Sequence, residues 1–119
     1  MVKIKMLIKN ITTKKMITHN AILCGGILSQ FIGLMFSKKG KQALIFRFNK
    51  EQIIALHMLF VFYPIDVLFL DKNKIVVDKK ENFKPFTFCK SRKKAMYAAE
   101  LPCGTIKKTK TDAGDKIKF

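Results

Sequence analysis

Asp66 is the residue whose surroundings point most directly to chemistry. It stands in the run Ile65-Asp66-Val67-Leu68, with apolar side chains on both sides. A buried carboxylate must be ion-paired, hydrogen-bonded or protonated. Three roles fit: it accepts backbone N–H groups at the corner made by Pro64, it anchors a ligand in a pocket, or it is a general acid or base. No second carboxylate stands beside it in the sequence, which disfavours the catalytic role.

His57 is the other side chain suited to acid–base chemistry, and it also lies in an apolar run. It pairs with Asp66 in a hydrolase-like site only if the two segments fold face to face, and a histidine satisfied within the core fits the sequence equally. The same two residues suggest a small-molecule pocket, whose predicted lining adds Gly33, Met35 and Met58. Methionines in such segments are more typical of core packing than of a ligand cage.

A second pattern combines aromatic and basic side chains near residue 90. Phe83, Phe86 and Phe88 are interleaved with cations. Aromatic rings for base stacking, beside cations for the phosphate backbone, are typical of single-stranded nucleic acid binding. The alternative is a hydrophobic loop that anchors itself to the body of the domain while its lysines are solvated. The predicted polyanion-binding residues here and in a later basic cluster are Lys84, Lys90, Arg92, Lys93, Lys94, Lys107, Lys108 and Lys110.

The overall charge limits the kind of recognition. The 119 residues contain 24 Lys and Arg against 8 Asp and Glu, a net charge of +16, and only Arg47 and Arg92 are arginines. Such a chain attracts polyanions such as nucleic acid. Lysine is a hydrated point charge, whereas arginine reads guanine edges and phosphates with a planar fork. The composition therefore predicts non-specific, salt-sensitive attraction and argues against base-specific reading.

Two segments lack basic side chains, and neither reads as a membrane span. The first, Met16–Ser37, is interrupted by polar residues and by Gly25-Gly26, and the second, Gln52–Leu70, contains Asp66. A carboxylate at the centre of a span costs about 2.5–3.5 kcal/mol. We therefore expect core segments, no membrane insertion and a cytoplasmic location.

Cysteine placement gives no sign of a metal or a disulfide framework. Cys24, Cys89 and Cys103 are odd in number and form no CxxC pair, and neither histidine stands near them in sequence. This pattern is typical of reduced intracellular thiols. The chain also lacks a glycine-rich phosphate loop and a nucleophile elbow. We expect no metal, no cofactor and no catalytic residue, and the sequence does not fix the oligomeric state.

Hydrophobic periodicity predicts a mainly β chain, at the margin of α+β. Alternation predicts strands near both ends of the chain and over Met16–Cys24, Ala43–Phe48 and Ala95–Leu101. Dense β-branched and aromatic residues predict buried strands over Ile53–Phe62 and Ile65–Leu70. Helices are expected over Leu28–Met35 and, shorter and basic, over Gly104–Thr111, while Asn82–Lys94 shows no clear period. The prediction is a single domain over residues 1–119: an antiparallel barrel or sandwich of about seven strands with one or two short helices.

Several segments together resemble a known family. They are Gly33–Phe36, Ala43–Phe48, Tyr63–Asp71, Glu100–Gly104 and Gly114–Asp115, and their order and spacing agree from about residue 21 to 119. The chain is similar in these segments to the uncharacterised domain-of-unknown-function family number 192. The resemblance implies a small β-rich domain and brings no established catalytic activity.

The chain departs from the family pattern in two places. Ser37 and then Lys38 follow the Gly-Leu-Met-aromatic segment, where many members have arginine. His57-Met58-Leu59-Phe60 stands where many have aromatic-Met-Lys-Asn before the proline. Any site that those polar groups line in relatives is incomplete here. The leading hypothesis is thus a non-enzymatic domain with weak polyanion binding, the alternative is a pocket around Asp66 and His57, and the third is an enzyme that uses both.

Overall fold

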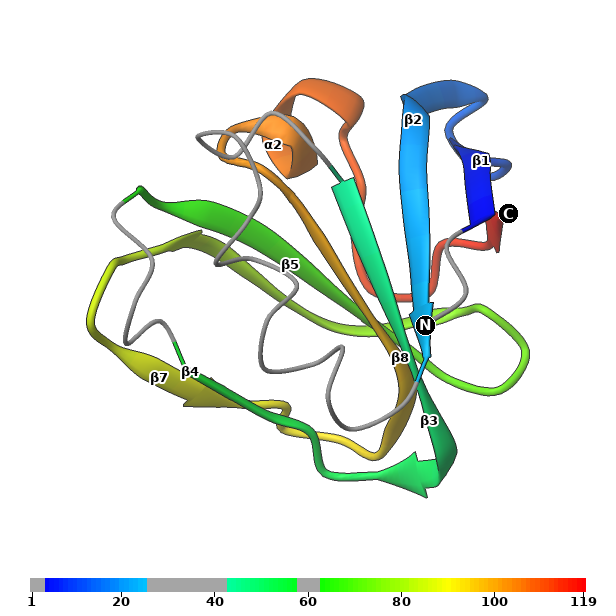
Figure 1. The fold of residues 1–119 in the computed structure, drawn as a ribbon. Coiled ribbons are helices and arrows are strands. Elements are labelled where there is room, and N and C mark those ends of the chain that lie inside the picture. The colour runs from blue at the N-terminus through cyan, green and yellow to red at the C-terminus, as the bar shows by residue number, and fades with distance from the viewer. Residues whose placement is uncertain (1–3, 26–42, 58–62) are drawn as a thin grey trace.

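The computed structural model describes residues 4–25, 43–57 and 63–119. In this part of the chain, nine strands and one helix account for most residues (Figure 1). The predicted helix over Leu28–Met35 lies outside the described residues. The elements are β1 (Ile4–Asn10), β2 (Lys15–Gly25), β3 (Ala43–Gln52), β4 (Ala55–His57), β5 (Ile65–Leu70), β6 (Val76–Phe83), β7 (Phe88–Lys90), β8 (Ala95–Pro102), α2 (Thr105–Thr109) and β9 (Ile117–Lys118).

Seven of the strands form one curled sheet, in the order β6-β5-β8-β3-β2-β1-β9, and β4 pairs with β7 in a second, two-stranded sheet. The predicted mainly β architecture is confirmed as a half-barrel, and the described residues include one short helix. One detail differs from the expected antiparallel arrangement, because β2 and β3 run parallel. A parallel pair needs a crossover of a dozen or more residues, and residues 26–42 provide that length between the two strands.

The curl brings the two ends of the large sheet together at a seam. Ile75, just before β6, forms an antiparallel bridge with Lys116, just before β9. The N–H of Val76 donates to the carbonyl of Asp115 at 2.9 Å. Nearby, the buried Asn10 amide of β1 donates to Thr111 Oγ1 at 3.0 Å and to the Asp115 carboxylate at 2.9 Å. The seam therefore joins three segments that are far apart in the sequence.

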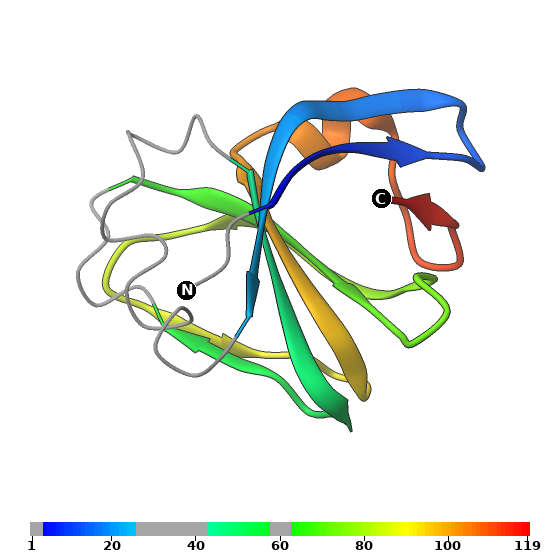
Figure 2. The same cartoon turned by 45° about the vertical axis from the view of Figure 1, so that its right-hand side comes forward.

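Each face of the sheet carries its own hydrophobic core, because side chains alternate along a strand. The interior face holds aliphatic residues of β1, β3, β5 and β8 with Ile106 of α2 and Ile117 of β9. The outer face carries Phe46, Phe69 and Phe83, and β4 and β7 cover it through Ile54, Leu56 and Cys89. Figure 2 shows the small sheet as a separate layer beside the large one. Strand β5 is buried along its whole length because both of its faces are covered.

The predicted strands around residues 16–24, 43–48, 65–70 and 95–101 are confirmed as β2, β3, β5 and β8. The predicted strand over Ile53–Phe62 is wrong at its start, since β4 begins only at Ala55. The reason is local: the Ile54 N–H donates to Ser91 Oγ at 2.9 Å, and the Ile54 carbonyl accepts from Ser91 N. The segment without a clear period, Asn82–Lys94, contains the short strand β7. None of the described helices is long and apolar enough to cross a membrane.

Candidate functional site

The β6–β7 arm, residues 76–94, carries both the exposed aromatic rings and most of the predicted cations. Phe83 ends β6 and is 1% exposed, so it is a core residue that fixes the arm to the outer face of the sheet. Phe86 and Phe88 are 60% and 69% exposed. Phe86 sits in the turn between the strands with a φ of 62°. The structure thus divides the three phenylalanines that the sequence grouped together into one anchor and two surface rings.

The cations around these rings fall into two kinds. Arg92 pairs with Asp78, and Lys79 lies 3.3 Å from Asp112 and 3.9 Å from Glu81. A further set is exposed, and within the described part of the chain no carboxylate lies within ion-pair distance of its members. These free cations of the arm are Lys80, Lys84, Lys90, Lys93 and Lys94. The arm therefore presents positive charge that intramolecular pairing leaves uncompensated.

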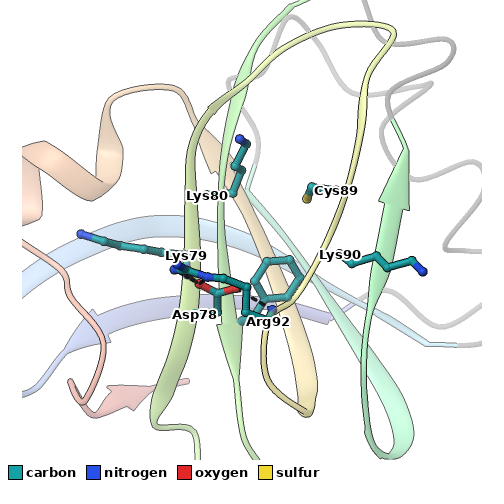
Figure 3. Close-up of a pocket in the computed structure, with 7 residues that line it drawn as sticks. Asp78, Lys79, Lys80, Cys89, Lys90 and Arg92 are labelled. Atoms are coloured by element: carbon teal, nitrogen blue, oxygen red, sulfur yellow. Dashed lines mark hydrogen bonds and ion pairs between the residues drawn. The ribbon is translucent and has the colours of Figure 1, made fainter.

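A hollow of about 380 Å³ opens between β6 and β7 (Figure 3). It exists because the two strands belong to different sheets: β6 pairs with β5, while β7 pairs with β4. Its lining is mostly basic, with a thiol and an aromatic ring as the less polar part. The lining residues are Phe69, Asp78, Lys79, Lys80, Cys89, Lys90 and Arg92.

Asp78 fixes one wall of this hollow by binding the loop before β8. The Arg92 side chain donates from Nη2 and Nε to Oδ1 at 2.6 and 3.1 Å, and the Arg92 backbone N–H donates to Oδ2 at 2.8 Å. Burial by itself raises the pKa of Asp78, but the hydrogen bonds from Arg92 and from the Lys79 N–H outweigh it and bring the pKa below its ordinary value. The carboxylate stays ionised, and Arg92 is held beside it.

The second predicted cluster, Lys107, Lys108 and Lys110, lies on and just after helix α2. All three side chains are exposed. Helix α2 and strand β7 lie apart in both views (Figures 1 and 2), although Lys79 of β6 pairs with Asp112 just after α2. The predicted polyanion-binding residues therefore form two separate surfaces, and only one of them carries exposed aromatic rings.

Asp66 joins three parts of the chain through backbone hydrogen bonds. Its Oδ1 accepts from the N–H of Asn82 at 3.0 Å, and its Oδ2 accepts from the N–H groups of Gly104 and Ile106 at 3.0 and 2.9 Å. Gly104 has a φ of 93°, a left-handed conformation that glycine adopts without strain. The side chain is 1% exposed. The carboxylate thus ties β5 to the end of β6 and to the start of α2.

The pocket predicted around Asp66 and His57 is not assembled by the described residues. Gly33, Met35 and Met58 lie outside them, and of His57 the structure describes only the backbone, which pairs with Phe88. Asp66 shares the interior face with its cross-strand partner Leu101, whereas β4, which carries His57, packs on the outer face. The sheet lies between them, so this geometry does not favour an acid–base pair. The pocket itself stays a prediction.

Sequence reasoning missed Glu100, a buried acid in the middle of β8. It is 4% exposed, and within the described part of the chain its Oε2 has no hydrogen-bond partner. Burial raises its pKa to about 8. Its cross-strand neighbours are Leu44 and Val67, both in the outer core. The signal was present in the sequence, because Glu100 follows Ala98-Ala99 and precedes Leu101 in the same apolar setting that singled out Asp66.

The two described cysteines are not activated thiols. Burial raises the pKa of Cys89, and burial with the neighbouring Asp66 and Glu81 carboxylates raises that of Cys103. Among the described residues, no three His, Cys, Asp or Glu side chains gather closely enough to hold a metal ion. The features that remain for ligand contact are therefore charge, aromatic surface and the hollow.

Comparison with known sequences gives the family. The profile of DUF192, described as "Uncharacterized ACR", matches residues 10–119. The chain belongs to DUF192. A UPF0127 protein of Pyrococcus furiosus is 35% identical over 112 residues, which cover 92% of this chain and 95% of the relative. A UPF0127 protein of Pyrococcus horikoshii is 36% identical over 99 residues, or 82% of this chain and 84% of the relative.

Two solved structures share the DUF192 chain's fold. A protein of unknown function from Novosphingobium aromaticivorans aligns with a TM-score of 0.82 at 17% identity, covering 98% of this chain and 85% of that one. A candidate transcription regulator from Sinorhizobium meliloti aligns with a TM-score of 0.81 at 21% identity, covering 98% and 93%. At these identities the likeness shows the fold.

Two of the segments that resemble DUF192, Tyr63–Asp71 and Glu100–Gly104, come together in the structure. In the pairing of β5 with β8, Asp66 lies opposite Leu101 and Ile65 lies opposite Pro102. Gly104 then donates its N–H to Asp66. The two segments thus form one unit, in which the carboxylate of the first orients the turn that ends the second.

Proposed function

We propose that this DUF192 protein binds single-stranded nucleic acid, weakly and without sequence preference, through the β6–β7 arm. The observation that carries the proposal is the pair of exposed rings, Phe86 and Phe88, among lysines that have no acidic partner in the described part of the chain. Rings stack on any base, and lysines follow the phosphate backbone without reading sequence. The near absence of arginine supports the lack of base preference.

The geometry supports the arm over the second cluster. Phe88 and Lys90 are two positions apart on β7 and both are exposed, so they share its solvent-facing side. Cys89, between them, packs inward with its cross-strand partner Leu56. The cluster on α2 has comparable charge, but Ile106, the large apolar residue of this helix, is buried and offers no surface to a base. Charge alone attracts a polyanion, whereas charge beside stacking surface also retains the bases.

The test is fluorescence anisotropy with a labelled oligothymidine at increasing salt. For the wild-type protein we expect log Kobs to fall linearly with log salt, with a slope of about −0.7 per neutralised phosphate. Replacing three lysines of the arm (K84Q, K90Q and K93Q together) is expected to reduce that slope by roughly 2. The double variant F86A/F88A is expected to lose about 1–3 kcal/mol per stacked base with little change in slope.

The matched control is the triple variant K107Q/K108Q/K110Q, which removes the same charge from the α2 cluster. It keeps the rings and the arm, so we expect a smaller loss of affinity than in the arm variant. No binding at low salt, or binding without a salt slope, contradicts the proposal. Equal losses in both triple variants would show diffuse attraction to the whole surface instead of an interface on the arm.

A further inference from the structure

The hollow between β6 and β7 has the size and charge of a site for one nucleotide. Its volume of about 380 Å³ falls within the roughly 300–1,000 Å³ of small-molecule sites. Four of its lining residues are cations and one, Asp78, is an acid. Asp78 is already bound by Arg92, so it does not neutralise the lysines. A ligand that enters here meets net positive charge on two sides.

Lys80 and Lys90 are the cations of the hollow that remain for a ligand. Lys79 lies near Asp112 and Glu81, whereas within the described residues no acid pairs with Lys80 or Lys90. Figure 3 shows these two on either side of Cys89, one from β6 and one from β7. In Figure 3 the ammonium groups of Lys79 and Lys90 point away from the hollow into solvent. Lysine stems are long and flexible, so a phosphate at the mouth can draw in ammonium groups from both strands.

Two residues of the lining, Cys89 and Phe69, are uncharged at neutral pH. Burial raises the pKa of the Cys89 thiol above its ordinary value, so the thiol stays protonated. Glu100, whose charge acts on Cys89, has a pKa raised by burial to about 8 and is mostly protonated at pH 7. Phe69 completes the lining. Phe69 is 1% exposed, so the less polar part of the lining is small, and the cations are the groups that would hold the phosphate of a nucleotide.

We infer that the hollow binds the phosphorylated end of a nucleic acid strand, with the terminal phosphate between Lys80 and Lys90. The inference rests on the proposed function, because the rest of the strand crosses the arm. The turn that carries Phe86 connects the two strands that flank the hollow. A strand whose terminal nucleotide is held in the hollow can therefore place its next bases on Phe86 and Phe88.

The experiment compares oligothymidines with a 5′-phosphate, a 3′-phosphate or hydroxyl ends. The hydroxyl-ended strand has two extra nucleotides, because a terminal phosphate carries about −1.5 to −2 charges at pH 7 and each added nucleotide carries one. We expect one phosphorylated strand to bind about tenfold more tightly than the hydroxyl-ended strand, the effect of one charge-assisted hydrogen bond. The variant K80Q/K90Q should lose this preference. The control K93Q/K94Q removes the same charge from the same arm outside the hollow, and it should keep the preference while binding all strands more weakly.

The outcomes separate the two proposals. Equal affinity for all three strands overturns the end-binding inference and leaves the proposed function standing. A preference that survives in K80Q/K90Q places the phosphate elsewhere and also overturns the inference. If no strand binds at low salt, the proposed function fails and the end-binding inference fails with it.

Discussion

The interior and outer faces of the curled sheet differ at one buried polar group, Glu100. On the interior face, the Asp66 carboxylate accepts three backbone N–H groups, and the Asn10 side chain donates two hydrogen bonds and accepts one from Thr13 N. On the outer face, Arg92 satisfies Asp78, but Glu100 is almost completely buried and its Oε2 has no hydrogen-bond partner among the described residues. Satisfied buried polar groups stabilise a fold, whereas an unsatisfied one costs free energy. The difference assigns Asp66 and Asn10 to architecture and makes the outer layer, with its hollow, the place to look for ligand contact.

The largest change in stability is expected at Phe83, which anchors the arm to the outer face of the sheet. Replacing Phe83 by alanine removes a fully buried ring from the outer core and is expected to lower the free energy of unfolding by about 3–5 kcal/mol. Replacing Phe88, which is exposed, should change it by less than about 0.5 kcal/mol. Urea unfolding of both variants measures this contrast. Similar losses in the two would show that Phe88 is also structural and would weaken its role in binding.

The interior face is tested at Asp66. The variant D66A leaves three backbone N–H groups without their acceptor and should lose about 3 kcal/mol, at a cost of roughly 1 kcal/mol or more per group. The isosteric variant D66N keeps one carbonyl oxygen and should lose less. Urea unfolding at neutral pH gives both values. A loss below about 1 kcal/mol in D66A would remove the structural assignment.

Replacing Glu100 is expected to raise the free energy of unfolding, the opposite of the effect at Phe83 and Asp66. Its pKa is higher in the folded protein, about 8, than the ordinary value of 4.5, so the folded state binds more protons between these values. Stability should therefore fall as pH rises from about 4.5 to 8 and level off above. In E100Q this dependence should disappear, with a gain of a few kcal/mol at pH 9 over the wild type, since a difference of one pKa unit corresponds to about 1.4 kcal/mol. The exposed Glu81 provides the control E81Q, in which the pH dependence should remain; a wild-type stability that rises between pH 5 and 8 contradicts the expectation.

The smallest effect is expected at Asp78, which connects the hollow to the loop before β8. Its pKa is lowered in the folded protein, so its contribution is complete above the ordinary value of 3.8 and is lost as pH falls through the lowered pKa. The variant D78N should lose about 1–2 kcal/mol at pH 7 and show a weaker acid dependence. Thermal unfolding between pH 2 and 7 measures both. Unchanged stability in D78N would mean that Arg92 does not need this partner to hold the loop.

The architecture was largely predictable because the alternation of apolar and polar residues along a strand is visible within a short stretch of sequence. The strands over Met16–Cys24 and Ala95–Leu101 show in their residue types. The parallel pairing of β2 and β3 was not predictable, since it depends on a partner chosen by tertiary packing. Strand β7 was missed because it has only three residues, with the exposed Phe88 and Lys90 on either side of the half-buried Cys89. A basic loop shows the same pattern.

The site was predictable only in part, for a related reason. The sequence places Lys84 and Lys90 near phenylalanines, but it cannot show that Phe83 turns inward while Phe86 and Phe88 turn outward. It also cannot show that Asp78 neutralises Arg92, because fourteen positions separate them and only the fold brings them together. Exposure and ion pairing depend on tertiary structure, and they decide which cations remain for a ligand.

The seam that closes the sheet has a consequence for how quickly the chain reaches its native state. Asn10 and Thr111, which bond there, are 101 positions apart, and Ile75 bridges to Lys116. Closing such long loops costs configurational entropy before any contact is gained, and chains dominated by distant pairings fold in milliseconds to seconds. The half-barrel should therefore form its local β1–β2 and β5–β6 pairs early and close last at the seam. Folding should then be slow for a chain of this size, and amide protons at the seam should gain protection after those of β5 and β8.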